Sequence, residues 1–155
     1  MTQKDVLRRA ASQILRSIPI SLVADHSELI IERLINHPSF TLAKGVCIYL
    51  AMAQEVQTLS FVKTAFDQNK RVFIPKIVGK NPQDMIILEI ASFEQILAFP
   101  KSKWGIPEPT MDFYSLADDK AESGLFDTIF VPAVAFDKRC GRLGHGRGYY
   151  GTILS

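Results

Sequence analysis

Near its C-terminal end, the chain alternates glycines with cationic side chains, and this is the stretch best suited to chemistry. Glycine has no Cβ, so several backbone N–H groups can point into one concavity and come close to an anion. Arginine adds forked, charge-assisted hydrogen bonds to phosphate oxygens. The pattern therefore indicates an anion site. Its residues are Gly141, Arg142, Gly144, His145, Gly146, Arg147 and Gly148.

The glycine loop should join a strand to a helix. An apolar run at 128–136 precedes it, and Pro132 interrupts that run, as expected at a strand end or bulge. Tyr149-Tyr150 begins a short helix, whose N-terminus would add unpaired N–H groups and a positive dipole end. A polyphosphate is the first ligand to consider, and a plain turn is the alternative. The spacing matches neither a P-loop nor a dinucleotide fingerprint.

Residues 130–150, FVPAVAFDKRCGRLGHGRGYY, resemble the signature of the 5-formyltetrahydrofolate cyclo-ligase family. Further matches to that family occur in order along nearly the whole chain. They are Lys4 and Arg8, Tyr49-Leu50 with Glu55, residues 70–75, Met85, and residues 104–109, WGIPEP. The resemblance implies ATP-dependent closure of 5-formyltetrahydrofolate to 5,10-methenyltetrahydrofolate, with release of ADP and phosphate. Such chemistry needs positioning and charge neutralisation rather than an enzyme nucleophile.

The resemblance also implies two neighbouring binding sites. His145 and Arg147 would lie near the transferring phosphoryl group, although His145 is alternatively a bystander in the loop. The implied ATP-binding residues are Lys4, Arg8, Arg142, Leu143, Gly144, His145, Gly146, Arg147, Gly148, Tyr149 and Tyr150. The implied folate-binding residues are Leu50, Glu55, Met85, Trp104, Gly148 and Tyr149.

Each match outside the glycine loop also has an ordinary structural interpretation. Lys4 and Arg8 are four residues apart on a predicted helix and would share a solvated basic edge. Glu55 would be a carboxylate favouring the start of the next helix. Met85 would fill the core, whereas the resemblance implies contact with the substrate ring. Trp104 would pin its loop to the body, which is compatible with its forming a wall for the pterin. For Lys4, Arg8 and Glu55 the family matches favour the functional interpretation.

Two departures from the family pattern concern the metal. The family has an aspartate after the two tyrosines, which the resemblance implies to be a magnesium ligand, but this chain has Gly151. Family members also continue further, with another strand and a second metal-binding aspartate. We therefore expect Mg²⁺ to enter with ATP, no metal ligand from this chain, and a single domain over 1–155 that lacks its C-terminal strand region. A catalytically impaired folate- or nucleotide-binding protein is the alternative function.

Composition narrows the remaining classes. With 155 residues, of which 47% are hydrophobic and 22% charged, the chain should form one globular domain. A net charge of +2 does not favour nucleic acid, and the basic residues lack the aromatic platform of an RNA-binding module. The two cysteines have no metal-type spacing. There is no apolar signal core or membrane-length run, so we expect a cytoplasmic protein. We also expect a monomer.

The periodicity predicts alternating helices and strands. The sequence favours an α/β domain of three layers, with helices flanking a mostly parallel sheet, and the resemblance implies the topology of the isomerase and CoA-transferase group. Ser17 is the expected cap of the second helix. Its apolar positions, Leu22, Leu29, Ile30, Leu34 and Ile35, should face inward. The first helix should carry Val6, Leu7, Ala10, Ala11 and Ile14 on one face. Predicted helices cover 2–16, 19–36, 58–69 and 93–99, and predicted strands cover 45–51, 71–78 and 85–90. The last strand should lie at an edge of the sheet or have one face in water, and 100–125 should be irregular.

Overall fold

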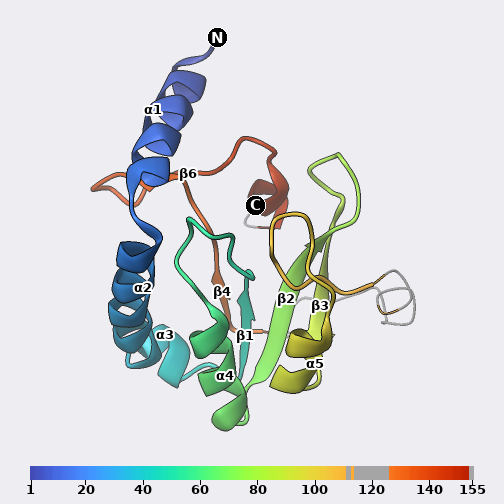
Figure 1. The fold of residues 1–155 in the computed structure, drawn as a ribbon. Helices are drawn as coiled ribbons and strands as arrows, with labels where there is room; N and C mark the ends of the chain where they lie inside the picture. Colours follow the sequence, from blue (N-terminus) through green and yellow to red (C-terminus); the bar gives the residue numbers. More distant parts are fainter. Residues whose placement is uncertain (111–112, 114–125, 154–155) are drawn as a thin grey trace.

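A mixed sheet of four strands lies at the centre of the molecule (Figure 1). The computed structural model describes residues 1–110, 113 and 126–153. The strands are β1 (Gly45–Ile48), β2 (Arg71–Ile77), β3 (Met85–Ile90) and β4 (Thr128–Phe130). Their order is β3-β2-β1-β4. β1 is parallel to β2 and to β4, whereas β3 is antiparallel to β2. The α/β class, the parallel crossover from β1 to β2 and the edge position of β3 are thus confirmed.

The register explains how a proline fits in β2. β1 pairs with β2 only as far as Phe73, so Pro75 lies beyond the part of the strand that β1 contacts. Pro75 is aligned with Ile87 of β3 on the other side. A proline has no N–H to donate, so it is tolerated where one side of a strand has no ladder to complete.

The main core lies between one face of the sheet and a group of helices. These are α2 (Ile20–Ile35), α3 (Pro38–Thr41), α4 (Leu59–Asp67) and α5 (Phe93–Ala98). Phe61 of α4 is fully buried, and its ring centroid lies 4.8 Å from those of both Phe40 and Phe130. Burying a side chain of this kind stabilises the fold by roughly 1.5–3 kcal/mol. The core therefore ties the sheet to α3 and α4.

The first helix, α1 (Gln3–Ser17), keeps its apolar residues largely out of the core. Thr2 and Asp5 form a capping box at its N-terminus. Within the described part of the chain, α1 buries none of its residues, and Val6, Leu7 and Ile14 are half exposed or more. The apolar face of α1 is therefore not packed against the core at these residues. The helix extends beyond the sheet and lies beside the glycine loop instead (Figure 1).

Several predictions for α2 need correction. Ser17 ends α1, donating its hydroxyl to the Ile14 carbonyl, and Pro19 precedes α2 without a side-chain cap. The helix buries only Ser27 and Ile31, a stripe narrower than its apolar residues suggest. Leu34 and Ile35 pack against the core as expected, but Leu22, Leu29 and Ile30 are exposed. The hydrophobic residues of α2 outnumber the positions that meet the core.

The segment after β4 leaves the main sheet. Pro132 follows the end of β4, as predicted, and the chain then forms a small antiparallel pair, β5 (Ala135–Phe136) with β6 (Arg142–Leu143). Asp137 closes the turn between them by accepting hydrogen bonds from the N–H groups of Arg139 and Gly141. The glycine loop then leads into α7 (Tyr149–Ile153). Most of the predicted irregular segment, 111–112 and 114–125, lies outside the described residues.

Candidate active site

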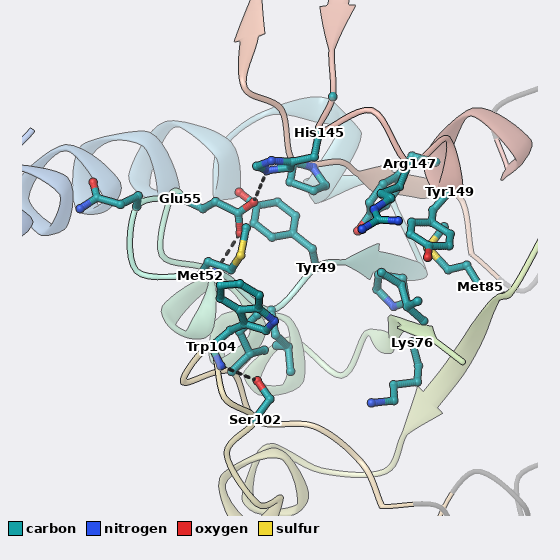
Figure 2. Close-up of a pocket in the computed structure, with 18 of the residues that line it drawn as sticks. Tyr49, Met52, Glu55, Lys76, Met85, Ser102, Trp104, His145, Arg147 and Tyr149 are labelled. Atoms are coloured by element: carbon teal, nitrogen blue, oxygen red, sulfur yellow. Dashed lines mark hydrogen bonds and ion pairs between the residues drawn. The ribbon is translucent and has the colours of Figure 1, made fainter. Parts of the chain in front are cut away.

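A cavity of about 1110 Å³ opens where the parallel strands end. Its walls come from α1, the segment after β1, the end of β2, the start of β3, residues 102–109 and the glycine loop with α7 (Figure 2). Ligands of open α/β sheets bind at the carboxyl ends of the strands. A cavity above the roughly 300–1,000 Å³ usual for one small ligand has room for two.

The glycine loop rests on α1 through Arg8. The Arg8 Nε donates to the Gly144 carbonyl oxygen at 3.0 Å, and its Nη1 donates to Asp5 at 2.9 Å. Gly146 has a φ of +95°, and a Cβ added there would lie 3.2 Å from the Arg8 Cζ. A glycine is thus needed at position 146 both for the backbone conformation and for the guanidinium beside it. Arg8 holds the loop and also lines the cavity.

Arg142 fixes the other side of the loop. Its Nε and Nη2 both donate to the Pro132 carbonyl oxygen, at 2.9 and 2.6 Å. Its Cζ lies 5.2 Å from the centroid of the Tyr150 ring, a cation–π contact. The guanidinium therefore joins β6 to the segment after β4 and to α7. These contacts favour a structural role for Arg142 over a role limited to ligand binding.

The end of the loop is held by the turn between β2 and β3. The Tyr149 hydroxyl donates to the Gly79 carbonyl oxygen at 2.9 Å. Gly148 has a φ of +81°, and a Cβ added there would lie 3.3 Å from Pro82. The loop is therefore fixed by three separate elements: α1, the segment after β4, and the β2–β3 turn.

Glu55 meets the glycine loop inside the cavity. One carboxylate oxygen accepts from the Met52 N–H at 2.8 Å, and the other lies 3.5 Å from the His145 Nε2 (Figure 2). The Glu55 side chain is 12% exposed, and it lines the cavity. A carboxylate held in this way can accept hydrogen bonds from a ligand that carries N–H groups.

Apolar side chains line two sides of the cavity. Figure 2 shows Trp104 and Met52 on one side of the cavity, with Met85 and Tyr149 on the other. The Trp104 side chain is 62% exposed and has the Lys103 Nζ 5.2 Å from its ring centroid. A flat apolar ligand would fit between walls of this kind.

Arg147 differs from the other cations of the loop. Arg8 and Arg142 bind backbone carbonyl groups, and His145 faces Glu55. Arg147 lines the cavity but forms no hydrogen bond or ion pair with any residue that the structure describes. Its guanidinium is thus available to an anionic ligand.

Burial keeps the neighbouring phenols and one thiol neutral. Desolvation raises the pKa of Tyr150, with a smaller contribution from nearby Cys47 and Glu55. Burial, followed by Glu55, also raises the pKa of Tyr49. Burial raises the pKa of Cys47 to about 12. These groups are hydrogen-bond donors and packing surfaces at neutral pH, not bases or nucleophiles.

The structure brings together most of the predicted site residues. Lys4 and Leu143 are the exceptions among those described, because neither lines the cavity. Lys4 lies on an exposed part of α1 one turn before Arg8, and Leu143 lies in β6. The predicted residues that do line it are Arg8, Leu50, Glu55, Met85, Trp104, Arg142, Gly144, His145, Gly146, Arg147, Gly148, Tyr149 and Tyr150.

Lys76, Glu108 and Gln54 are among the polar residues of the cavity wall that sequence reasoning missed. Lys76 of β2 forms an ion pair with Glu108, and both line the cavity. Gln54 also lines it, and its buried Oε1 accepts no hydrogen bond from the described residues. A lysine inside the apolar run RVFIPKIV was the available signal, because a charge there needs a partner. Gln54 gave no such signal.

The described residues do not form a metal site. No group of three His, Cys, Asp or Glu side chains able to hold an ion occurs among the described residues. Gly151 offers no carboxylate, and Glu108 is paired with Lys76. The donors present do not fit a protein-held magnesium ion.

No described helix is long and apolar enough to cross a bilayer.

Comparison with known proteins gives a consistent result. The chain is 34% identical over 154 residues to a probable 5-formyltetrahydrofolate cyclo-ligase of Schizosaccharomyces pombe, covering 99% of this chain and 72% of that protein. It is 34% identical to the mouse 5-formyltetrahydrofolate cyclo-ligase, covering 96% and 71%. The solved structure of Aquifex aeolicus 5,10-methenyltetrahydrofolate synthetase matches with a TM-score of 0.74 at 25% identity, covering 99% and 72%.

The model of the 5-formyltetrahydrofolate cyclo-ligase family matches residues 1–155. The chain therefore belongs to the 5-formyltetrahydrofolate cyclo-ligase family.

Proposed function

We propose that the protein catalyses the ATP-dependent cyclisation of 5-formyltetrahydrofolate to 5,10-methenyltetrahydrofolate, with release of ADP and phosphate. The observation that carries this proposal is the 3.5 Å contact between Glu55 and His145. It brings the carboxylate implied for folate and the loop implied for ATP into one cavity. A phosphoryl group can pass between two substrates only if their sites adjoin in this way.

On the folate side, we assign the pterin to the space between Trp104 and Met85, with Leu50 and Tyr149 completing the walls. Glu55 would accept hydrogen bonds from the pterin N–H groups. The buried Oε1 of Gln54 supports a further polar contact with the ligand, because an unpaired acceptor is costly to bury.

On the nucleotide side, we assign the phosphates to the backbone amides from Gly144 to Gly148. Arg147 would neutralise the transferring phosphoryl group, because it has no partner among the described residues. Arg8 and Arg142 would act mainly by holding the loop, given their hydrogen bonds to Gly144 and Pro132. Lys4 and Leu143 stay predictions from the resemblance.

The reaction needs two displacements. The formyl oxygen attacks the γ-phosphorus of ATP, the bond from that phosphorus to the β,γ-bridging oxygen breaks, and ADP leaves. N10 then attacks the formyl carbon, the carbon–oxygen bond breaks, and inorganic phosphate leaves; N10 loses its proton. Phosphorylation makes the formamide oxygen a leaving group. The protein's part is alignment and charge neutralisation.

Mg²⁺ would enter with ATP and would not be held by a ligand from the protein. It would supply charge neutralisation on the phosphates. We also propose that the protein is a monomer in the cytoplasm. Its ligands would be a reduced folate and ATP, and it would have no nucleic acid or membrane partners.

The direct test follows the methenyl chromophore. Protein, ATP, Mg²⁺ and 5-formyltetrahydrofolate are mixed, and 5,10-methenyltetrahydrofolate is monitored by its absorbance. We expect product in proportion to enzyme and dependent on ATP. If folate and ATP bind but no product forms, the proposed catalysis is wrong and the protein is a catalytically impaired binding protein.

Gly151 is the observation that favours this alternative, because the family pattern has an aspartate there. Gly151→Asp separates the two functions. A Cβ at position 151 would have no atom within 4 Å, and its backbone lies outside the left-handed region, so an aspartate fits. If the missing carboxylate limits the reaction, Gly151→Asp raises kcat and lowers the Mg²⁺ concentration required. Gly151→Asn, of similar size but uncharged, is the control. Equal rates for both variants would argue against a metal role at this position.

A further inference from the structure

The Trp104 wall is carried by a short hairpin, residues 101–108. Lys101 and Pro107 form an antiparallel bridge, and the Ser102 N–H donates to the Ile106 carbonyl oxygen at 2.8 Å. The tip turns at Gly105, whose φ is +76°. Trp104 therefore projects from the tip of a two-stranded ribbon, not from the central sheet.

A ribbon of this size does not hold its own position. Isolated two-stranded hairpins are marginally stable in water. Among the described residues, the backbone hydrogen bonds of 101–108 stay inside the ribbon or reach Pro100 at its base. Over the residues described, its polar tie to another element is the ion pair from Glu108 to Lys76 of β2. Pro109, which is buried, provides an apolar anchor beside it.

The ion pair is built on a rigid support. Lys76 lies inside the β2–β3 ladder, aligned with Ile86, one pair before the ladder ends at Ile77 and Met85. Its side chain is 16% exposed and that of Glu108 is 36% exposed, so both charges are partly withdrawn from water. The Lys76 Nζ donates to Glu108 Oε2 at 2.5 Å. A partly buried lysine on a strand has little freedom to leave its partner.

We propose that the Lys76–Glu108 ion pair is a clasp that fixes the 101–108 hairpin beside the cavity, so that Lys76 is a positioning residue for the folate ring through Trp104. The inference rests on the proposed function for the ligand's identity. The clasp itself concerns the protein without ligand. Lys76 acts through Glu108 and touches no reacting atom.

The experiment uses Trp104 as its own reporter, because it is the one tryptophan of the chain. Acrylamide quenching and fluorescence anisotropy are measured without ligands for the full chain, for Lys76→Met, for Glu108→Gln, and for the exchanged double variant Lys76→Glu/Glu108→Lys. We expect each single variant to increase quenching and lower anisotropy. The exchanged variant should restore both values towards those of the original chain.

Kinetics then test the consequence for the substrate. Each single variant should raise KM for 5-formyltetrahydrofolate by about fivefold, which corresponds to about 1 kcal/mol. The affinity for an ATP analogue should not change, and the exchanged variant should recover much of the loss. This split between the two substrates would not follow from a general loss of stability.

The matched control removes another ion pair that involves β2. Arg71 of β2 and Glu89 of β3 form two hydrogen bonds, at 2.7 and 2.6 Å, at the end of the ladder away from Met85. Arg71→Met and Glu89→Gln should leave Trp104 quenching unchanged. Equal quenching in the control and clasp variants would overturn the proposal.

Two other results would also overturn it. If Lys76→Met weakens folate binding while Glu108→Gln does not, Lys76 binds the ligand directly and is no clasp. If Trp104 quenching is the same in all variants, the hairpin is held by other contacts. Absence of methenyl product in the original chain would instead overturn the proposed function. It would leave the clasp untouched, because the quenching experiment contains no substrate.

Discussion

The glycine at position 146 allows the phosphate-binding proposal to be tested by adding one methyl group. Gly146 has a φ of +95°, and a Cβ there would lie 3.2 Å from the Cζ and Nε of Arg8. Side chains rarely adopt this backbone conformation, and holding one there costs about 1–3 kcal/mol. In Gly146→Ala, the loop must either keep this strain or move away from Arg8.

The cost can be converted into an expected loss of binding. If the loop relaxes in the free protein and must be restored to bind phosphates, 1–3 kcal/mol corresponds to a Kd for ATP weaker by roughly fivefold to 150-fold. Titration calorimetry with a non-hydrolysable ATP analogue measures this directly. Urea unfolding of the free protein gives the part of the strain that stays in the folded state.

Gly151→Ala provides the comparison, because the chemical change is identical and the surroundings are not. Gly151 lies in α7, has no left-handed backbone, and has open space around an added Cβ. Alanine in a helix is favoured over glycine by up to about 1 kcal/mol, so this variant should keep its stability and its ATP affinity. A Gly146→Ala variant that binds the analogue within about twofold of the original chain would refute the reasoning.

Three further predictions concern single side chains. Glu55→Gln should raise KM for the folate by about tenfold to 100-fold, the loss of a charged acceptor, with ATP affinity unchanged; an equal loss for both ligands would contradict this assignment. Arg147→Met should lower kcat while urea unfolding stays within about 0.5 kcal/mol, because Arg147 has no partner among the described residues; full activity would refute it. Hydrogen bonds from the backbone N–H groups of Gly45 and Lys44 hold the pKa of Asp127 below its ordinary value. Its contribution to stability should be complete above about pH 4 and be lost as the pH falls through the folded pKa, so Asp127→Asn should be less stable at pH 7 and approach the original chain in acid; a pH-independent difference in urea midpoint would contradict this.

The central sheet was predictable because its strands are buried apolar runs bounded by polar residues. β3 begins and ends at the predicted residues, and β2 is one residue shorter than expected. The antiparallel direction of β3 was less accessible, since a short connection after β2 at residues 78–84 was the only cue. The sheet order follows from contacts between distant segments, which local periodicity does not contain.

The outer helices show the limit of periodicity. An apolar stripe predicts which face of a helix avoids water, but the partner surface decides how much of it is covered. Phe61, Val62 and Ala65 of α4 meet the sheet and are fully buried. Val6 and Ile14 of α1 are as apolar and stay exposed. The difference lies in position: α4 has extensive contacts with the sheet, whereas α1 extends beyond it.

The site was predictable where its residues interact with a ligand and less so where they interact with one another. The resemblance identified Glu55, Trp104 and Arg147 as ligand contacts, and all three line one cavity. It gave no indication that Glu108 pairs with Lys76, because the two are 32 residues apart and belong to different elements. Pairings of this kind depend on tertiary structure.

The division of charges around the cavity explains why positioning should dominate the catalysis. Arg8 and Arg142 are committed to carbonyl groups, and Lys76 is committed to Glu108. These contacts fix the loop and the hairpin before any ligand arrives. Arg147 is the loop cation left without a partner in the described structure. Fixed dipoles and a single uncommitted guanidinium require little reorganisation when charge develops on a phosphoryl group. Weakening the supports should therefore reduce the rate even where every group that contacts substrate is intact.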